Sequence, residues 1–260
     1  YREERLLMKR VKMVLAYDGT NYRGWQIQKN GETIESMLNR ALSDLTGEEI
    51  RVCGASRTDS GVHAMGNVAV FDTNARMAAD KFSYALNQRL PEDIRIQRSR
   101  EVAPDFHPRY QETVKTYEYR ILNREFPLPA CRLNTYFMYY ELDVERMRQA
   151  AAYLVGEHDF QSFCAAGAQV KTTVRTVYDL QVFREGDLIT IRITGNGFLY
   201  NMVRIIAGTL IKVGTGEWEP SYIIEILEAR DRRLAGPTAP ARGLTLMHMV
   251  FRGEKPRRES

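Results

Sequence analysis

Two segments near the start of the chain decide its fold: VKMVLAY (residues 11–17) and IESMLNRALSDL (residues 34–45). Apolar residues alternate in the first segment, which predicts a strand with one face turned to a core. In the second they follow helical spacing, with Thr33 placed to cap the start of a helix and Gly47 to stop it. A strand followed by an amphipathic helix predicts a sheet with a helix packed on one face.

Alternating strands and helices continue along the rest of the chain. The first half adds predicted strands around residues 50–53, 67–72 and 94–96, with a helix around 82–86. The second half predicts a strand at 117–121, a helix at 144–155, a hairpin of 176–183 with 189–194, helices at 199–213 and 221–229, and a closing strand at 244–251. This order is typical of an α+β fold.

Composition limits the class of protein. The chain has 260 residues and a formal net charge of +4, an excess that permits nucleic-acid binding without demanding it. Cys53, Cys131 and Cys164 are scattered, which favours neither a disulfide framework nor a zinc site and predicts a cytoplasmic protein. The apolar runs are too short to span a bilayer, so no membrane partner is expected. Residues 1–7 are interpreted as an extension or a cloning remnant.

The strongest candidate for catalysis is the stretch GASRTDSGVHA (residues 54–64), in which Asp59 follows Arg57 by two residues and precedes Gly61 by two. A carboxylate on a tight loop beside a guanidinium stays ionised, which suits a nucleophile or a base. The alternative is an ordinary turn that faces water.

Aromatic and cationic residues of the second half offer further candidates. Tyr117 and Tyr119 stand at strand spacing, where an aromatic ring either stacks on an extruded base or packs in the core. The core is favoured for Tyr119, while both readings stay open for Tyr117. Arg204 lies beside an apolar helix face, so it either reaches water or pairs with a carboxylate, for which Asp59 is a candidate.

Several chemistries lack their motifs in the sequence. We find no GxxxxGK[ST], no GxGxxG after a strand, no HExxH and no CxxC, and the four histidines stand apart. We therefore expect chemistry by one carboxylate, with no metal and no cofactor.

Six segments of the chain, taken in order, resemble the TruA family of pseudouridine synthases. They are YDGTNYRGWQ (17–26), GASRTDSGVHA (54–64), FHPR (106–109), KTYEYRI (115–121), GFLYNMVR (197–204) and ARGL (241–244). The resemblance covers nearly the whole chain from Met8 onwards. It implies an isomerase that detaches uracil from C1′ of its ribose, rotates it and rejoins it through C5, after the base has been flipped out of its stem.

The resemblance also implies roles for individual residues. Asp59 matches the catalytic aspartate, Tyr117 the tyrosine packed against the target base, and Arg204 the arginine paired with the aspartate. Arg57 matches a basic residue near the flipped nucleotide, and Leu244 an apolar residue that lines the pocket.

The family's substrate is uridine at positions 38–40 of the tRNA anticodon stem-loop, and its members are homodimers with a basic cleft. Three further residues, Arg23, Gln26 and Arg109, are expected to contact the RNA. The implied fold is α+β, with two ferredoxin-like-derived halves that form a mostly antiparallel central sheet, flanking helices and an active-site cleft between the halves. The expected domains are residues 8–110, which carry the Asp59 loop, and residues 111–260.

Two other functions fit parts of the sequence. One is a non-catalytic RNA-binding module of ferredoxin-like topology, although the aromatic RNP1 pattern is missing. The other is a hydrolase or lyase of free nucleosides, which would act on uridine or its monophosphate.

Overall fold

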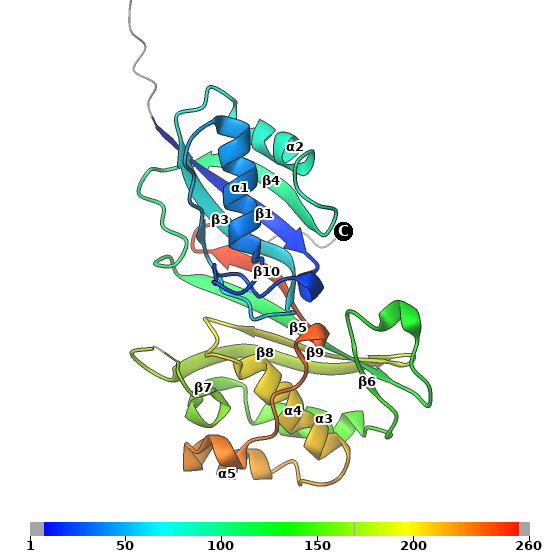
Figure 1. Cartoon of the computed structure of the whole chain (residues 1–260). Coiled ribbons are helices and arrows are strands. Elements are labelled where there is room, and N and C mark those ends of the chain that lie inside the picture. The colour runs from blue at the N-terminus through cyan, green and yellow to red at the C-terminus, as the bar shows by residue number, and fades with distance from the viewer. Residues whose placement is uncertain (1–7, 169, 255–260) are drawn as a thin grey trace, which may run out of the picture. The chain divides into compact units, whose positions relative to one another are not determined.

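The computed structural model describes residues 8–168 and 170–254. The chain divides after Glu112 into two compact units, called here the N-terminal unit and the C-terminal unit. Each contains strands and helices, so the fold is α+β, as predicted (Figure 1).

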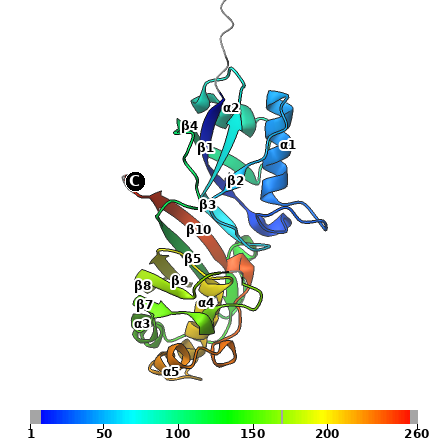
Figure 2. The ribbon, with the colours of Figure 1, turned by 90° about the vertical axis from the view of Figure 1, so that its left-hand side faces the viewer.

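The N-terminal unit is built on an antiparallel sheet. Its strand β1 (Lys9–Tyr17) lies between β3 (His63–Thr73) and β4 (Ile94–Val102), and the short β2 (Cys53–Gly54) pairs with β3. The helices α1 (Ile34–Thr46) and α2 (Phe82–Asn87) lie on the same side of this sheet (Figure 1, Figure 2). Their apolar faces and alternate residues of β1 form the core.

Local signals set the ends of α1 as predicted. The Thr33 side chain accepts a hydrogen bond from the Ser36 N–H, and the Ser36 hydroxyl accepts one from the Thr33 N–H, which completes a capping box. Gly47 ends the helix in the left-handed region, with φ 72°.

The C-terminal unit has a sheet in the order β10-β5-β9-β8-β7, with antiparallel neighbours. The strands are β5 (Thr113–Asn123), β7 (Gly156–Asp159), β8 (Val174–Glu185), β9 (Leu188–Gly195) and β10 (Leu244–Phe251), while β6 (Tyr136–Met138) runs parallel to the end of β5. The helices α3 (Val144–Ala152), α4 (Met202–Gly214) and α5 (Tyr222–Ala229) lie on one side of it (Figure 1).

Three sequence-based expectations were wrong in detail. Residues 50–52 form no strand, because the N–H groups of Ile50 and Val52 donate to the side chains of Ser43 and Asn39 on α1 rather than to a neighbouring strand. The helix expected from residue 199 begins at Met202, because Asn201 adopts a left-handed backbone with φ 59°. The strands β6 and β7 were missed because they have only 3 and 4 residues.

Candidate active site

Asp59 lies on the loop that joins β2 to β3, residues 55–62, called here the Asp59 loop. A buried hydrogen-bond network supports this loop from the sheet side. The Tyr17 hydroxyl lies 2.7 Å from the Thr58 hydroxyl, and the Asn67 side-chain amide donates to the Tyr17 hydroxyl over 3.1 Å and to the Ser56 carbonyl over 2.9 Å. Asn67 has no exposed surface. The network therefore joins the loop to β1 and β3 through groups that water does not reach.

Residues 22–25 support the same loop from its other side. The Trp25 N–H donates to the Thr58 carbonyl over 3.0 Å, and the Ser60 hydroxyl donates to the Tyr22 carbonyl over 3.2 Å. Gly24 has φ +85°, and a Cβ there would lie 2.7 Å from the Thr58 carbonyl oxygen. Only glycine allows this approach of two backbones.

The Trp25 indole fills the space beneath Gly54, where the loop begins. A Cβ on Gly54 would lie 2.3 Å from the indole carbons, and Trp25 is only 1% exposed. Close packing of backbone on a large buried ring leaves the start of the Asp59 loop little freedom to move.

The tip of the loop is a tight turn that presents Asp59. The Val62 N–H donates to the Asp59 carbonyl over 3.1 Å, and Gly61 has φ +80°. Asp59 is half-buried, whereas Arg57 is exposed.

The predicted RNA-contact residues of the N-terminal unit all lie at the surface. Arg23, Gln26 and Arg109 are exposed, and Arg109 donates its Nε–H to the Gly54 carbonyl over 2.9 Å. Arg109 therefore lies at the start of the Asp59 loop, a proximity that its distance in the sequence does not reveal.

His63 follows the loop and lies buried at the start of β3. Its Nδ1 accepts a hydrogen bond from the Gly19 N–H over 3.0 Å. This hydrogen bond joins the backbone of Gly19 to β3, so His63 contributes to the structure around the Asp59 loop.

The other predicted site residues belong to the C-terminal unit. Tyr117 and Tyr119 share one face of β5, at 7% and 0% exposure, and the Tyr117 and Phe198 rings form a T-shaped pair at a centroid distance of 5.3 Å. The Tyr119 hydroxyl donates to the Pro240 carbonyl over 2.8 Å, and burial raises the pKa of this phenol. Tyr119 is therefore a core residue, as favoured, and Leu244 lies opposite it on β10.

Arg204 lies in the first turn of α4, half-buried beside Tyr119. Its Nε–H donates to the Ala239 carbonyl over 2.8 Å, and its Nη1 donates to the Asn201 side chain over 3.0 Å. Its positive charge acts on the Tyr119 phenol. The C-terminal unit thus brings Arg204 and Leu244 to the same tyrosine, which stands two residues from Tyr117 on β5.

Sequence reasoning missed the residues that support these groups. Asn67 and Tyr17 look like ordinary members of alternating strands, although an amide at a core position of β3 is a signal for a buried polar network. Phe198 was assigned to no role, and the glycine before it was the only hint of a turn that places its ring against Tyr117.

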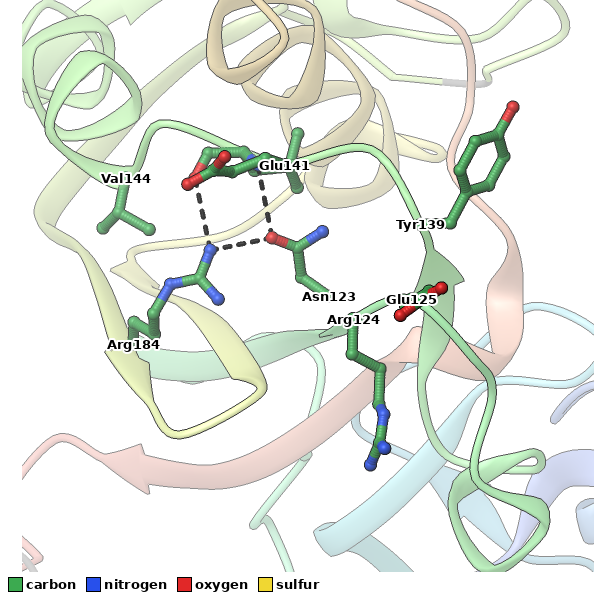
Figure 3. A pocket seen from close by; sticks show the side chains of 8 residues that line it. Asn123, Arg124, Glu125, Tyr139, Glu141, Val144 and Arg184 are labelled. Carbon is green, nitrogen blue, oxygen red and sulfur yellow. Dashed lines mark hydrogen bonds between the residues drawn. The ribbon is translucent and has the colours of Figure 1, made fainter.

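A separate pocket of about 580 Å3 lies in the C-terminal unit (Figure 3). There Arg184 donates Nη2 to the Asn123 side chain over 2.7 Å and to the Leu142 carbonyl over 3.2 Å. Its lining includes none of the predicted site residues, so the pocket is not part of the predicted site.

The α+β fold agrees with a comparison of the chain with known families. A sequence model of the family described as tRNA pseudouridine synthase matches residues 13–111 and 150–252. The chain belongs to this family, and it is an enzyme of the isomerase class.

Individual relatives extend the match to almost the whole chain. The chain is 50% identical over 244 residues to the tRNA pseudouridine synthase A of Acetivibrio thermocellus. It is 49% identical over 245 residues to that of Ruminiclostridium cellulolyticum and 48% identical over 246 residues to that of Brevibacillus brevis. Each alignment covers 94% of this chain and 100% of the relative.

A chain in a solved structure titled "Crystal Structure of a Cbf5-Nop10-Gar1 Complex" is similar at a TM-score of 0.34 and 13% identity, over 77% of this chain and 54% of that chain. That likeness carries no functional argument. In the described part of the chain, no helix combines the length and the apolar character that crossing a bilayer would require.

Proposed function

We propose that this enzyme isomerises uridine to pseudouridine at positions 38–40 in the anticodon stem-loop of tRNA, with Asp59 as the catalytic carboxylate. The observation that carries the proposal is the support of the Asp59 loop. A catalytic group has to be held by neighbours that cannot relax, and buried contacts from Tyr17, Asn67 and Trp25 hold this loop from two sides.

The reaction conserves all atoms of the substrate. The bond from C1′ to N1 of uracil breaks, a bond from C1′ to C5 forms, and the proton lost from C5 is balanced by one gained at N1. Asp59 supplies the carboxylate on which this exchange depends, and no cofactor or metal is required. The target base lies in a stem, so it has to leave the stack before it reaches the carboxylate.

Other residues receive roles that suit their environments. The Tyr117 ring packs against the flipped base and Leu244 lines the pocket around it. Arg204 pairs with Asp59, because a half-buried guanidinium gains most from a charged partner. Arg57 is exposed and takes a phosphate, while Arg23, Gln26 and Arg109 contact the RNA at the surface.

The assembly we propose is a homodimer that acts in the cytoplasm, with one tRNA held in a basic cleft that both subunits form. Dimerisation concentrates the cations of a chain whose net charge is only +4. Within each chain, residues 8–110 supply the Asp59 loop and residues 111–260 supply Tyr117 and Arg204.

The position of the modified uridine tests the proposal. Unmodified tRNA transcripts that carry uridine at only one of positions 38, 39 and 40 are incubated with the enzyme, and pseudouridine is mapped. We expect product at each of these positions, and none in a transcript with cytidine at all three. Product formation elsewhere would overturn the assignment of positions.

The rival functions give different results in the same assay. A non-catalytic RNA-binding module would bind the transcript without product. A nucleoside hydrolase or lyase would turn over free uridine or its monophosphate, which we expect to stay unchanged.

A further inference from the structure

Lys115 and Arg175 bring two positive charges to one face of the C-terminal sheet. Lys115 on β5 stands opposite Gly195 on β9, and Gly195 stands opposite Val177 on β8. Residues opposite one another on neighbouring strands share a face, as do residues two apart in one strand. Lys115 and Arg175 therefore lie on the face that also carries Tyr117.

The surroundings of Lys115 are partly apolar. A Cβ on Gly195 would lie 3.2 Å from the Phe198 ring, so this ring covers the glycine that faces Lys115. Burial and the charge of Arg175 lower the pKa of Lys115 to about 8, and burial also lowers the pKa of Arg175. Two positive charges in a partly buried, apolar environment destabilise each other unless an anion binds between them.

Within residues 8–168 and 170–254 the protein supplies no carboxylate to either cation. The acidic group that acts on Arg175 is the Cys164 thiol, and burial raises the pKa of this thiol, which keeps it in its neutral form. Arg175 donates its Nη1 only to the carbonyls of Thr172 and Val174, over 2.9 and 2.6 Å. The carboxylate of Asp159, on the neighbouring β7, instead accepts hydrogen bonds from the Thr173 hydroxyl over 2.6 Å and from the Gln161 N–H over 3.1 Å.

The opposite face of the same strand shows how this chain neutralises cations elsewhere. There Glu118, 2% exposed, accepts hydrogen bonds from Arg192 over 2.7 and 2.9 Å and from Arg120 over 3.0 Å. Two arginines thus share a buried carboxylate on one face of β5, whereas the two cations on the other face share none.

We propose that Lys115 and Arg175 together bind one phosphodiester of the RNA substrate, next to the nucleotide whose base packs against Tyr117. The inference rests on the proposed function for the place of the base. Lys115 stands two residues from Tyr117 along the strand, about 6.6 Å, which is close enough for a single nucleotide to reach both. A phosphate fits because it is anionic and accepts hydrogen bonds from an ammonium and a guanidinium at once.

The test measures binding of a labelled, unmodified tRNA transcript at several KCl concentrations. The variants are Lys115→Met, Arg175→Met and the double variant, and Lys212→Met is the control, since Lys212 already pairs with Glu217 over 2.6 Å. Each single variant is expected to lower affinity about tenfold and to reduce the slope of log K against log salt by about 1.

Because both cations hold the same phosphate, the double variant should lose hardly more slope than either single variant. Thermal unfolding checks folding, and Lys115→Met should be at least as stable as the parent because it removes a partly buried charge. An unchanged slope of log K against log salt in the folded single variants would overturn the proposal. A double variant whose loss of slope equals the sum of the two single losses would also overturn it, because the two cations would then bind separate phosphates.

Failure of the phosphate site and failure of the proposed function give different results. If the parent enzyme forms pseudouridine at positions 38–40 and the slopes do not change, only the phosphate site is wrong. If the parent forms no product there, the proposed function is wrong whatever the slopes show.

Discussion

Tyr17→Phe removes a single hydroxyl from the network beneath the Asp59 loop. That hydroxyl lies 2.7 Å from the Thr58 hydroxyl and accepts a hydrogen bond from the Asn67 amide over 3.1 Å. The ring itself is kept, so its packing in the core, where Tyr17 is 4% exposed, stays unchanged. The substitution therefore removes these two buried hydrogen bonds without removing the ring.

The expected loss of stability follows from those two bonds. A buried hydrogen bond contributes about 1 kcal/mol net, and a group left without a partner costs more. One N–H of the Asn67 amide keeps its bond to the Ser56 carbonyl, whereas its other N–H and the Thr58 hydroxyl lose the partner that the Tyr17 oxygen supplied. We therefore expect the free energy of unfolding to fall by about 2 kcal/mol.

Urea denaturation and steady-state kinetics check this prediction. The urea concentration at the unfolding midpoint should fall, while the slope of the unfolding free energy against urea concentration stays constant. The value of kcat should fall about tenfold, and the KM for tRNA should change less, because the loop that carries Asp59 loses its support. The control is Tyr84→Phe in the same unit, where the tyrosine is 69% exposed and the expected change is below about 0.5 kcal/mol. A variant with parental stability and parental kcat would refute the claim that this network holds the loop.

Three further predictions concern backbone, charge and pH. Gly24→Ala should lower the free energy of unfolding in urea more than Gly47→Ala does. Both glycines have positive φ, but of the two only Gly24 would place a Cβ against backbone, 2.7 Å from the Thr58 carbonyl oxygen. An equal loss of stability in the two variants would contradict this close approach. Arg204→Ala should lower turnover by roughly a hundredfold with tRNA binding retained, since the proposed partner of Asp59 is lost; parental turnover would rule out that pairing. Affinity for tRNA should decline as the pH rises from 7 to 9, because Lys115, whose pKa is lowered to about 8, loses its charge over this range. An equal decline in Lys115→Met would show that another group causes the pH dependence.

The parts of the fold that local chemistry determines could be predicted from the sequence. The helix α1 begins at a capping threonine and ends at a glycine, and both signals lie within a few residues of the groups that they stabilise. The turn at Glu185-Gly186-Asp187 joins β8 and β9 for the same reason, with Gly186 at φ +59°.

Features that depend on distant partners could not be predicted. The backbone at Ile50 and Val52 has the composition of a strand, but side chains of α1 take its N–H groups. Tyr17 and Asn67 stand 50 residues apart, and only the register of β1 with β3 brings them to the Asp59 loop. The like-charged pair of Lys115 and Arg175 also depends on two strand pairings that join residues far apart in the chain.

The role of Asp59 as the catalytic carboxylate is tested by the turnover of Asp59→Asn on an unmodified tRNA transcript. The substitution keeps the size of the side chain and removes its charge, and Asp80→Asn is the control because Asp80 is an exposed acid of the same unit, 3.3 Å from Lys81. We predict that the Asp59 variant binds tRNA with parental affinity and forms no pseudouridine, while the Asp80 variant forms it at the parental rate. Substantial pseudouridine formation by Asp59→Asn would show that Asp59 is not the catalytic carboxylate.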